Sequence, residues 1–111
     1  MQMIEFEQIV GGQVKSGRAY LEFLRVASLS MGVYHLKAGQ VDLQQPHTED
    51  EVYYVVEGQA EFRAGDDTQQ VKPGTVIFVE KLEEHRFFNI SEDLTVLVFF
   101  APAEGSAHAS H

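Results

Sequence analysis

Short runs of β-branched and aromatic residues, separated by turn-forming residues, cover most of the chain. Such runs are typical of strands, and Gly58-Gln59, Gly65-Asp66-Asp67 and Pro73-Gly74 are typical of the turns between them. No segment shows a sustained 3.6-residue apolar period with helix caps, so helices should be few, and Gln8–Gly17 should be a loop or a flexible edge. The pattern predicts an all-β sandwich or barrel. The strand-like runs are Ala19–Ala27, Leu29–Lys37, Glu51–Glu57, Ala60–Ala64, Thr75–Glu80, His85–Ile90 and Leu94–Ala101.

The length of the chain, 111 residues, fits one domain. We expect this domain to span residues 1–102, and residues 103–111 to form a disordered C-terminal tail because they are small and polar. The sequence has no cysteine, which excludes disulfides, zinc–thiolate sites and thiol nucleophiles. Any metal ion must therefore be held by histidine, carboxylate, amide or water ligands.

The net charge of −9, from 17 acidic and 8 basic residues, bears on the choice of partner. Phosphate backbones and anionic membranes require a basic surface, so we expect neither nucleic acid nor membrane as a partner. The N-terminus lacks a basic segment followed by an apolar run, and no apolar stretch approaches a membrane span. A cytoplasmic location is the default expectation.

Two segments carry histidines in an informative context. Gln45 and His47 are two residues apart, and Glu51 shares their parity, so an extended chain would point all three to one face, with Tyr53 continuing it. His85 precedes two further residues, Phe87 and Asn89, at strand spacing, which indicates that His85 is turned inward.

The first segment resembles the first motif of the cupin family, which runs Gly, five residues, His-x-His, three or four residues, Glu, six residues, Gly. This sequence has Gly39, five residues, Gln45-x-His47, three residues, Glu51, six residues and Gly58. It departs from the motif only at the first histidine, where it has Gln45.

The second segment resembles the second cupin motif, which runs Gly, five residues, Pro-x-Gly, two residues, His, three residues, Asn. This sequence has Gly74, five residues, Glu80-x-Leu82, two residues, His85, three residues and Asn89. The histidine and the asparagine match, whereas Glu80 and Leu82 replace the Pro and the Gly.

The resemblance covers Gly39–Asn89 and implies a double-stranded β-helix, or jelly-roll barrel, with one divalent metal ion (Fe, Mn, Ni or Zn) in one mouth. Carried over by position, the metal ligands would be Gln45, His47, Glu51 and His85. A glutamine oxygen is a weaker donor than imidazole for such ions. Gln45 would therefore either retune an Fe(II) site, ligating directly or through a bound water, or mark a weakened site that has lost its metal.

Three functions remain open at this stage. The first is a metal-dependent, dioxygenase-like enzyme on a small organic substrate, with Glu51 as anionic ligand and proton acceptor and with Tyr53 placing a phenol near the metal. The second is a metal-dependent isomerase, lyase or hydrolase that needs no O₂. The third is a binding module without catalysis, which holds a small molecule. The resemblance also suggests a homodimer.

Other ionisable residues are expected to have ordinary roles. Glu49 and Asp50 should belong to a solvated turn beside the site. His35 should serve a surface or interface role rather than bind metal, and His108 and His111 belong to the tail.

Overall fold

Two long strands organise the fold, which a computed structural model describes for residues 1–106. Each of these strands pairs with the other along most of its length, and the shorter strands add to their edges. Within the described residues the elements are α1 (Phe6–Ser16), β1 (Tyr20–Val26), β2 (Leu29–Leu36), β3 (Asp50–Ala64), β4 (Asp67–Val71), β5 (Val76–Val79) and β6 (His85–Ala101).

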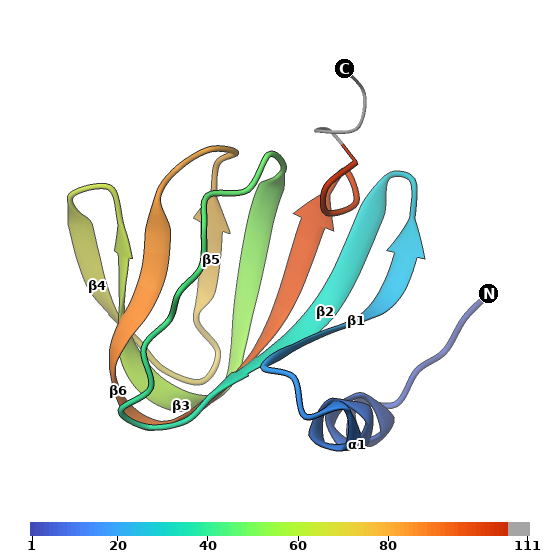
Figure 1. Cartoon of the computed structure of the whole chain (residues 1–111), viewed down its shortest axis with the longest axis horizontal. Helices are drawn as coiled ribbons and strands as arrows, with labels where there is room; N and C mark the ends of the chain where they lie inside the picture. Colours follow the sequence, from blue (N-terminus) through green and yellow to red (C-terminus); the bar gives the residue numbers. More distant parts are fainter. Residues whose placement is uncertain (107–111) are drawn as a thin grey trace.

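The six strands form one antiparallel sheet that curves round, and the two long strands, β3 and β6, bend within it (Figure 1). The first part of β3 lies between β5 and the end of β6, where the order continues through β2 to β1. The last part of β3, Ala60–Ala64, lies between β4 and the start of β6. All strand pairs are antiparallel. The predicted double-stranded β-helix, or jelly-roll barrel, is confirmed.

The bend in β3 corrects one expectation from the sequence. Gly58-Gln59 has the residues of a tight turn between two strands, but β3 runs through it, with register shifts against β6 between Val55 and Glu61. Gly58 has a φ of 98°, and a Cβ there would lie 2.4 Å from the carbonyl oxygen of Asp93. The glycine thus lets β3 bend against β6 instead of reversing direction.

β6 likewise is one strand where the sequence predicted two, His85–Ile90 and Leu94–Ala101, with a break at residues 91–93. Asn89, beside this bend, has a φ of 46°, a left-handed conformation that asparagine tolerates better than most residues, and its side chain donates to Glu61 (2.6 Å).

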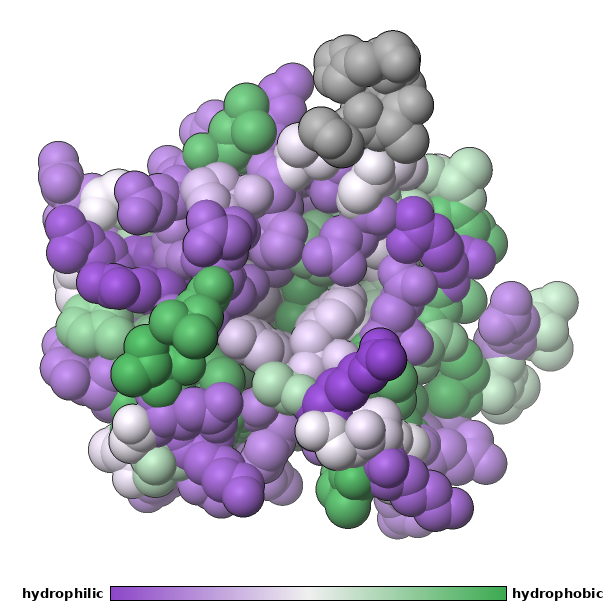
Figure 2. Space-filling model, viewed as in Figure 1, coloured by the Kyte–Doolittle hydropathy of each residue, from purple (hydrophilic) through white to green (hydrophobic). Residues whose placement is uncertain are grey.

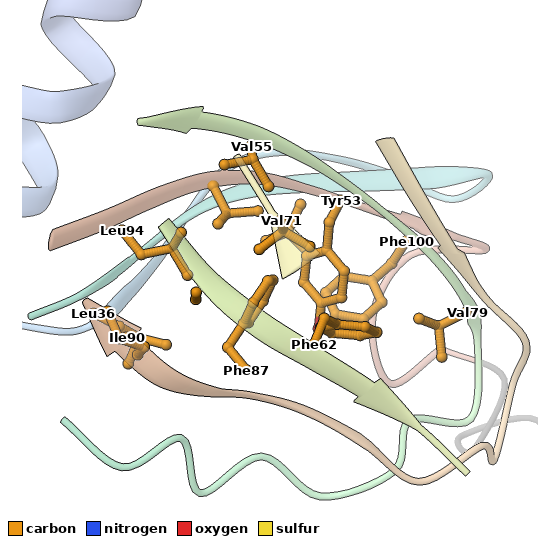
Figure 3. Packing of buried hydrophobic residues seen from close by; sticks show 13 residues of the cluster. Leu36, Tyr53, Val55, Phe62, Val71, Val79, Phe87, Ile90, Leu94 and Phe100 are labelled. Atoms are coloured by element: carbon orange, nitrogen blue, oxygen red, sulfur yellow. The ribbon is translucent and has the colours of Figure 1, made fainter. Parts of the chain in front are cut away.

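The barrel interior is filled by side chains from the inner face of the curved sheet (Figure 3). Aromatic rings from β3 and β6 pack edge to face in its middle: the centroids of Phe62 and Phe87 are 4.8 Å apart, and those of Tyr53 and Phe87 are 5.1 Å apart. Apolar burial of this kind is the main stabilising contribution to such a domain. The cluster contains Leu36, Tyr53, Val55, Ala60, Phe62, Val71, Val79, Phe87, Ile90, Leu94, Val96, Val98 and Phe100.

The segment expected as a loop, Gln8–Gly17, is almost entirely helical. It belongs to α1, which ends at Gly17 in a left-handed conformation, with the Gly17 N–H donating to the carbonyl oxygen of Val14. The glycines inside α1 concealed the helix from propensity arguments, since glycine is a poor helix former. Of the described helices, none is both long and apolar enough to cross a membrane.

The expected tail also needs correction at its start. Ala103 is buried, and residues 104–106 form a turn on the barrel. The Glu104 N–H donates to Ser30 Oγ, and the Gly105 N–H donates to Glu49 Oε1, both at 2.9 Å. The composition of this segment does not reveal that its backbone binds two buried side chains, Ser30 and Glu49. Residues 107–111, which include His108 and His111, lie outside the described residues.

Candidate metal centre and adjoining pocket

Three side chains from separate segments converge at one mouth of the barrel. His47 comes from the loop before β3, Glu51 from the start of β3 and His85 from the first residue of β6. One potential ligand atom from each lies within 4.8 Å of the others. Glu51 Oε1 is 3.0 Å from His85 Nε2 and 3.9 Å from His47 Nε2. Three of the four side chains that the two motifs indicate are therefore brought together.

The loop around residue 82 helps to hold the two histidines near each other. Leu82 has a φ of 67°, and its N–H donates to the carbonyl oxygen of His47 at 2.7 Å. Leu82 stands where the family motif has glycine, so the left-handed backbone persists although the glycine does not. The tight link between the two loops fixes the backbone of His47 close to the start of β6.

Three contacts place the ring of His85. Nδ1 donates to the carbonyl oxygen of Glu83 at 2.8 Å. Nε2 lies 3.0 Å from the Tyr53 hydroxyl, which itself donates to Gln44 Oε1 at 2.9 Å, and 3.0 Å from Glu51 Oε1. Nε2 therefore faces two oxygen atoms, and either a proton on Nε2 or a metal ion held with Glu51 suits this arrangement.

Burial by itself would lower the pKa of His85, but the Glu51 carboxylate, the Glu83 carbonyl and the charge of Asp42 outweigh it and raise this pKa. The pKa of Tyr53 lies well above its usual value, because of burial first and then the Glu51 charge. Tyr53 thus stays protonated and acts as a hydrogen-bond donor.

Glu51 is the most unusual group in the cluster. Glu51 is 2% exposed, and its carboxylate has no hydrogen-bond donor among the described residues apart from the ionic contact of Oε1 with His85 Nε2 at 3.0 Å. A buried carboxylate with so few donors is costly, and a bound cation is one of the few partners that offset this cost. The donor set of two imidazoles and one carboxylate is also a usual one for divalent transition metals. These residues fit a metal ion.

Gln45, the fourth predicted ligand, is exposed. The parity argument required an extended strand, but residues 37–49 form no strand, so alternation along the chain does not hold there. The neighbouring amide, Gln44, faces the site instead: its Oε1 accepts from Tyr53 and lies 3.4 Å from His47 Nε2.

Asp42, which sequence reasoning missed, fixes Gln44 in this position. Asp42 is 3% exposed and its Oδ2 accepts from Gln44 Nε2 and from the N–H of Phe87, both at 2.9 Å. Its Oδ1 accepts from the Tyr34 hydroxyl at 2.7 Å. An isolated aspartate in a polar loop gives no sequence signal of this role. Asp42 thus connects the loop of residues 37–49 to β2 through Tyr34 and to β6 through Phe87.

A pocket of about 280 Å³ adjoins the cluster. Figure 2 shows a mainly hydrophilic face that is hollowed near its middle, with hydrophobic side chains visible inside. Aromatic side chains form much of the pocket wall, and Glu104 of the C-terminal turn contributes a second carboxylate beside Glu51. The lining residues are Tyr20, Tyr34, Leu43, Gln44, His47, Glu51, Val98, Phe100 and Glu104.

Comparison with known proteins decides the family. Residues 32–101 match the family described as Cupin domain. The chain belongs to the cupin family. A protein of Streptomyces coelicolor described as uncharacterized protein SCO3923 is 43% identical to this cupin over 104 residues, which are 94% of this chain and 99% of that protein.

Solved structures agree with this assignment. TT1209 from Thermus thermophilus superimposes on this cupin with a TM-score of 0.71 at 20% identity, covering 93% of this chain and 99% of that chain, and it shows the fold alone. The DMSP lyase DddQ from Ruegeria pomeroyi DSS-3 has a TM-score of 0.64 at 25% identity, with 68% of this chain covered. This cupin spans 39% of the DddQ chain.

The remaining expectations concern residues around the cupin site. Glu49, expected in a solvated turn, is 2% exposed and bonds Gly105 and the Thr48 hydroxyl. Asp50 is exposed, as expected. His35 lies on β2 outside the cluster, with Nδ1 3.2 Å from Thr95 Oγ1.

Proposed function

We propose that this cupin binds one divalent metal ion through His47, Glu51 and His85 and uses it to transform a small organic molecule in the adjoining pocket. The observation that carries the proposal is the Glu51 carboxylate, which is buried without a hydrogen-bond donor apart from its contact with His85 and faces two histidines. The pocket is lined by two of these residues, His47 and Glu51, and is large enough for a small molecule.

A dioxygenase-like reaction is the first form of this proposal. Two histidines and one carboxylate have the composition of the Fe(II) site in non-haem oxygenases, which leaves positions open for other ligands. Bound Fe(II) would supply redox chemistry with O₂, whereas bound Zn(II) or Ni(II) would polarise a substrate oxygen. Around it, Tyr53 remains a protonated donor, Gln44 orients that donor, and the aromatic wall excludes water from a bound substrate.

An isomerase or lyase that needs no O₂ uses the same residues, and so does a binding module. The choice of metal separates them. If the reaction is redox, iron supports turnover and zinc does not; if it is Lewis-acid chemistry, zinc or nickel can substitute. A binding module is stabilised by its ligand and yields no product.

The first experiment is elemental analysis of untagged protein purified without added metal. We expect close to one metal ion per chain, and we expect His85→Ala to lose it because His85 supplies one of three ligands. His35→Ala is the matched control, since His35 is a half-buried histidine outside the cluster and should leave the metal content unchanged.

All variants should be made with His108 and His111 replaced, so that these two histidines cannot bind stray metal. Circular dichroism checks that each variant is folded. The proposal is wrong if folded protein takes up none of Fe(II), Mn(II), Ni(II) or Zn(II), or if His85→Ala retains the metal of the parent protein.

Two further expectations accompany this proposal. We propose a homodimer, for which the exposed edge of β1 and the exposed side chains of Tyr54, Val76 and Phe78 offer surfaces. We also propose a cytoplasmic location.

A further inference from the structure

The two histidines of the cluster present the same ring nitrogen to Glu51. Glu51 Oε1 lies 3.0 Å from His85 Nε2 and 3.9 Å from His47 Nε2. A neutral histidine that binds a metal through Nε2 carries its ring proton on Nδ1, and this proton needs an acceptor. For His85 the acceptor is the carbonyl oxygen of Glu83, at 2.8 Å. His47 requires a corresponding acceptor on the far edge of its ring.

Glu104 lies at that edge. Its Oε2 is 3.6 Å from His47 Nδ1, which is within ion-pair distance and slightly beyond hydrogen-bond distance. Nδ1 has no other hydrogen-bond or ion-pair partner within residues 1–106. The Glu104 side chain is 35% exposed, so it has freedom to close the remaining gap. Glu104 is therefore the group in place to accept the Nδ1 proton.

The C-terminal turn holds the backbone of Glu104 beside the cluster. The Glu104 N–H donates to buried Ser30 at 2.9 Å, and its carbonyl oxygen accepts from Arg25 Nη2 at 2.7 Å. The next N–H, of Gly105, donates to buried Glu49 at 2.9 Å. Figure 1 shows this turn at the same end of the barrel as the start of β3. The side chain at position 104 thus starts from a fixed point.

Packing alone leaves the orientation of the His47 ring open. Phe100 packs edge to face against it, with ring centroids 4.8 Å apart and an interplanar angle of 67°, and this contact restrains the plane of the ring. A half-turn about the Cβ–Cγ bond would keep that plane but present a carbon atom in place of Nε2 to Glu51. A carboxylate beside Nδ1 favours the orientation and the tautomer that leave the Nε2 lone pair free.

We propose that Glu104 is a positioning residue of the metal centre, whose carboxylate accepts the Nδ1 proton of His47 and so directs the Nε2 lone pair toward the metal. This inference rests on the proposed function, because it assigns a role in the same metal centre. Glu104 and Glu51 together also supply two negative charges, which match the charge of one divalent ion.

Zinc affinity, measured by competition with a chromogenic chelator, tests this role. Glu104→Ala removes the acceptor, and we expect zinc to bind about tenfold more weakly. This is the lower end of the range for groups that orient a metal-bound histidine, because the Glu104 side chain is partly exposed. Glu104→Gln keeps an acceptor oxygen without the charge, so its affinity should lie between those of Glu104→Ala and the parent.

Glu22→Gln is the matched control for charge. Glu22 lies on β1 and pairs with Arg25, the residue that also binds the C-terminal turn, and not with a histidine. This change should leave the zinc affinity within about twofold of the parent, because an exposed charge without a direct contact has little effect. The inference is wrong if Glu104→Ala binds zinc as tightly as the parent, or if Glu22→Gln weakens binding as much as Glu104→Gln does.

A second readout does not depend on metal. Long-range proton–nitrogen NMR spectra of the metal-free protein, at a pH where the imidazole is neutral, show which ring nitrogen of His47 carries the proton. We expect the proton on Nδ1 in the parent. In Glu104→Ala we expect a larger share on Nε2, because Gln44 Oε1, 3.4 Å from Nε2, is then the remaining acceptor. A role of Glu104 in folding alone would leave the tautomer unchanged.

The two readouts separate this inference from the proposed function. An unchanged tautomer of His47 in folded Glu104→Ala overturns this inference, even when the parent binds metal. Failure of the parent to take up zinc or any other divalent metal contradicts the proposed function, and the tautomer then still decides whether Glu104 orients the ring.

Discussion

Gly58 is the residue at which the fold depends most directly on the absence of a side chain. It combines a φ of 98° with an approach to the Asp93 carbonyl that leaves no room for a Cβ. Gly58→Ala should lower the free energy of unfolding by about 2–5 kcal/mol, because it adds backbone strain to a steric clash at the bend of β3. Denaturant titration measures this loss.

Gly74→Ala is the control for that substitution. Gly74 has a similar φ of 92°, but a Cβ there meets nothing within 4 Å, so only the backbone cost of about 1–2 kcal/mol remains. Equal losses in the two variants would mean that the approach of β3 to β6 at Asp93 is looser than described.

Residue spacing predicted which side chains face the barrel interior only where the chain forms a regular strand. Glu51 and Tyr53 face inward because they lie on a real strand, and His85 does so because it starts one. The spacing argument does not extend to Gln45, because residues 37–49 form no strand, and the contact by which Asp42 fixes Gln44 is one that spacing does not encode. Glu104 was missed because a turn of small and polar residues resembles a tail.

At the scale of elements, the C-terminal turn should contribute to stability. Deleting residues 103–111 removes buried Ala103 and the donors to Ser30 and Glu49, and it leaves the Glu49 carboxylate with fewer partners. We expect a loss of about 2–4 kcal/mol in the free energy of unfolding. Deleting only residues 107–111 is the control; if both deletions have the same effect, the turn does not carry the loss.

Strand content was largely predictable, and the joins between strands were not. β-branched and aromatic runs marked β1, β2 and β5 to within two residues at each end. The sequence analysis divided β3 and β6 each into two strands at a polar or glycine-containing segment. In the structure these segments are bends through which the pairing of β3 with β6 continues, and their residues are the same as those of a turn. β4, with the sequence DTQQV, has only one buried residue and so lacked an apolar signal.

At the scale of the whole molecule, metal binding and folding should be linked. The cluster joins the loop before β3, β3 itself and β6, so it exists only when the barrel is closed. A metal present at about 100 times its Kd stabilises the folded state by about 2.7 kcal/mol, and a chelator removes this contribution. Thermal unfolding with and without EDTA measures it as a shift in Tm of roughly 10 °C for a domain of this size.

At Glu51, the stability of the metal-free protein and the binding of metal should place opposite demands on the side chain. In the metal-free protein its carboxylate is buried, and its nearest polar partner is His85 Nε2 at 3.0 Å. At a pH above the raised pKa of His85, where this histidine is neutral, Glu51→Gln removes an unfavourable buried charge and should leave the metal-free protein at least as stable as the parent. The same change removes the anionic ligand, so the stabilisation by metal should disappear. If metal-free Glu51→Gln is clearly less stable than the metal-free parent, the carboxylate serves the fold through His85, and its role as a ligand loses its main support.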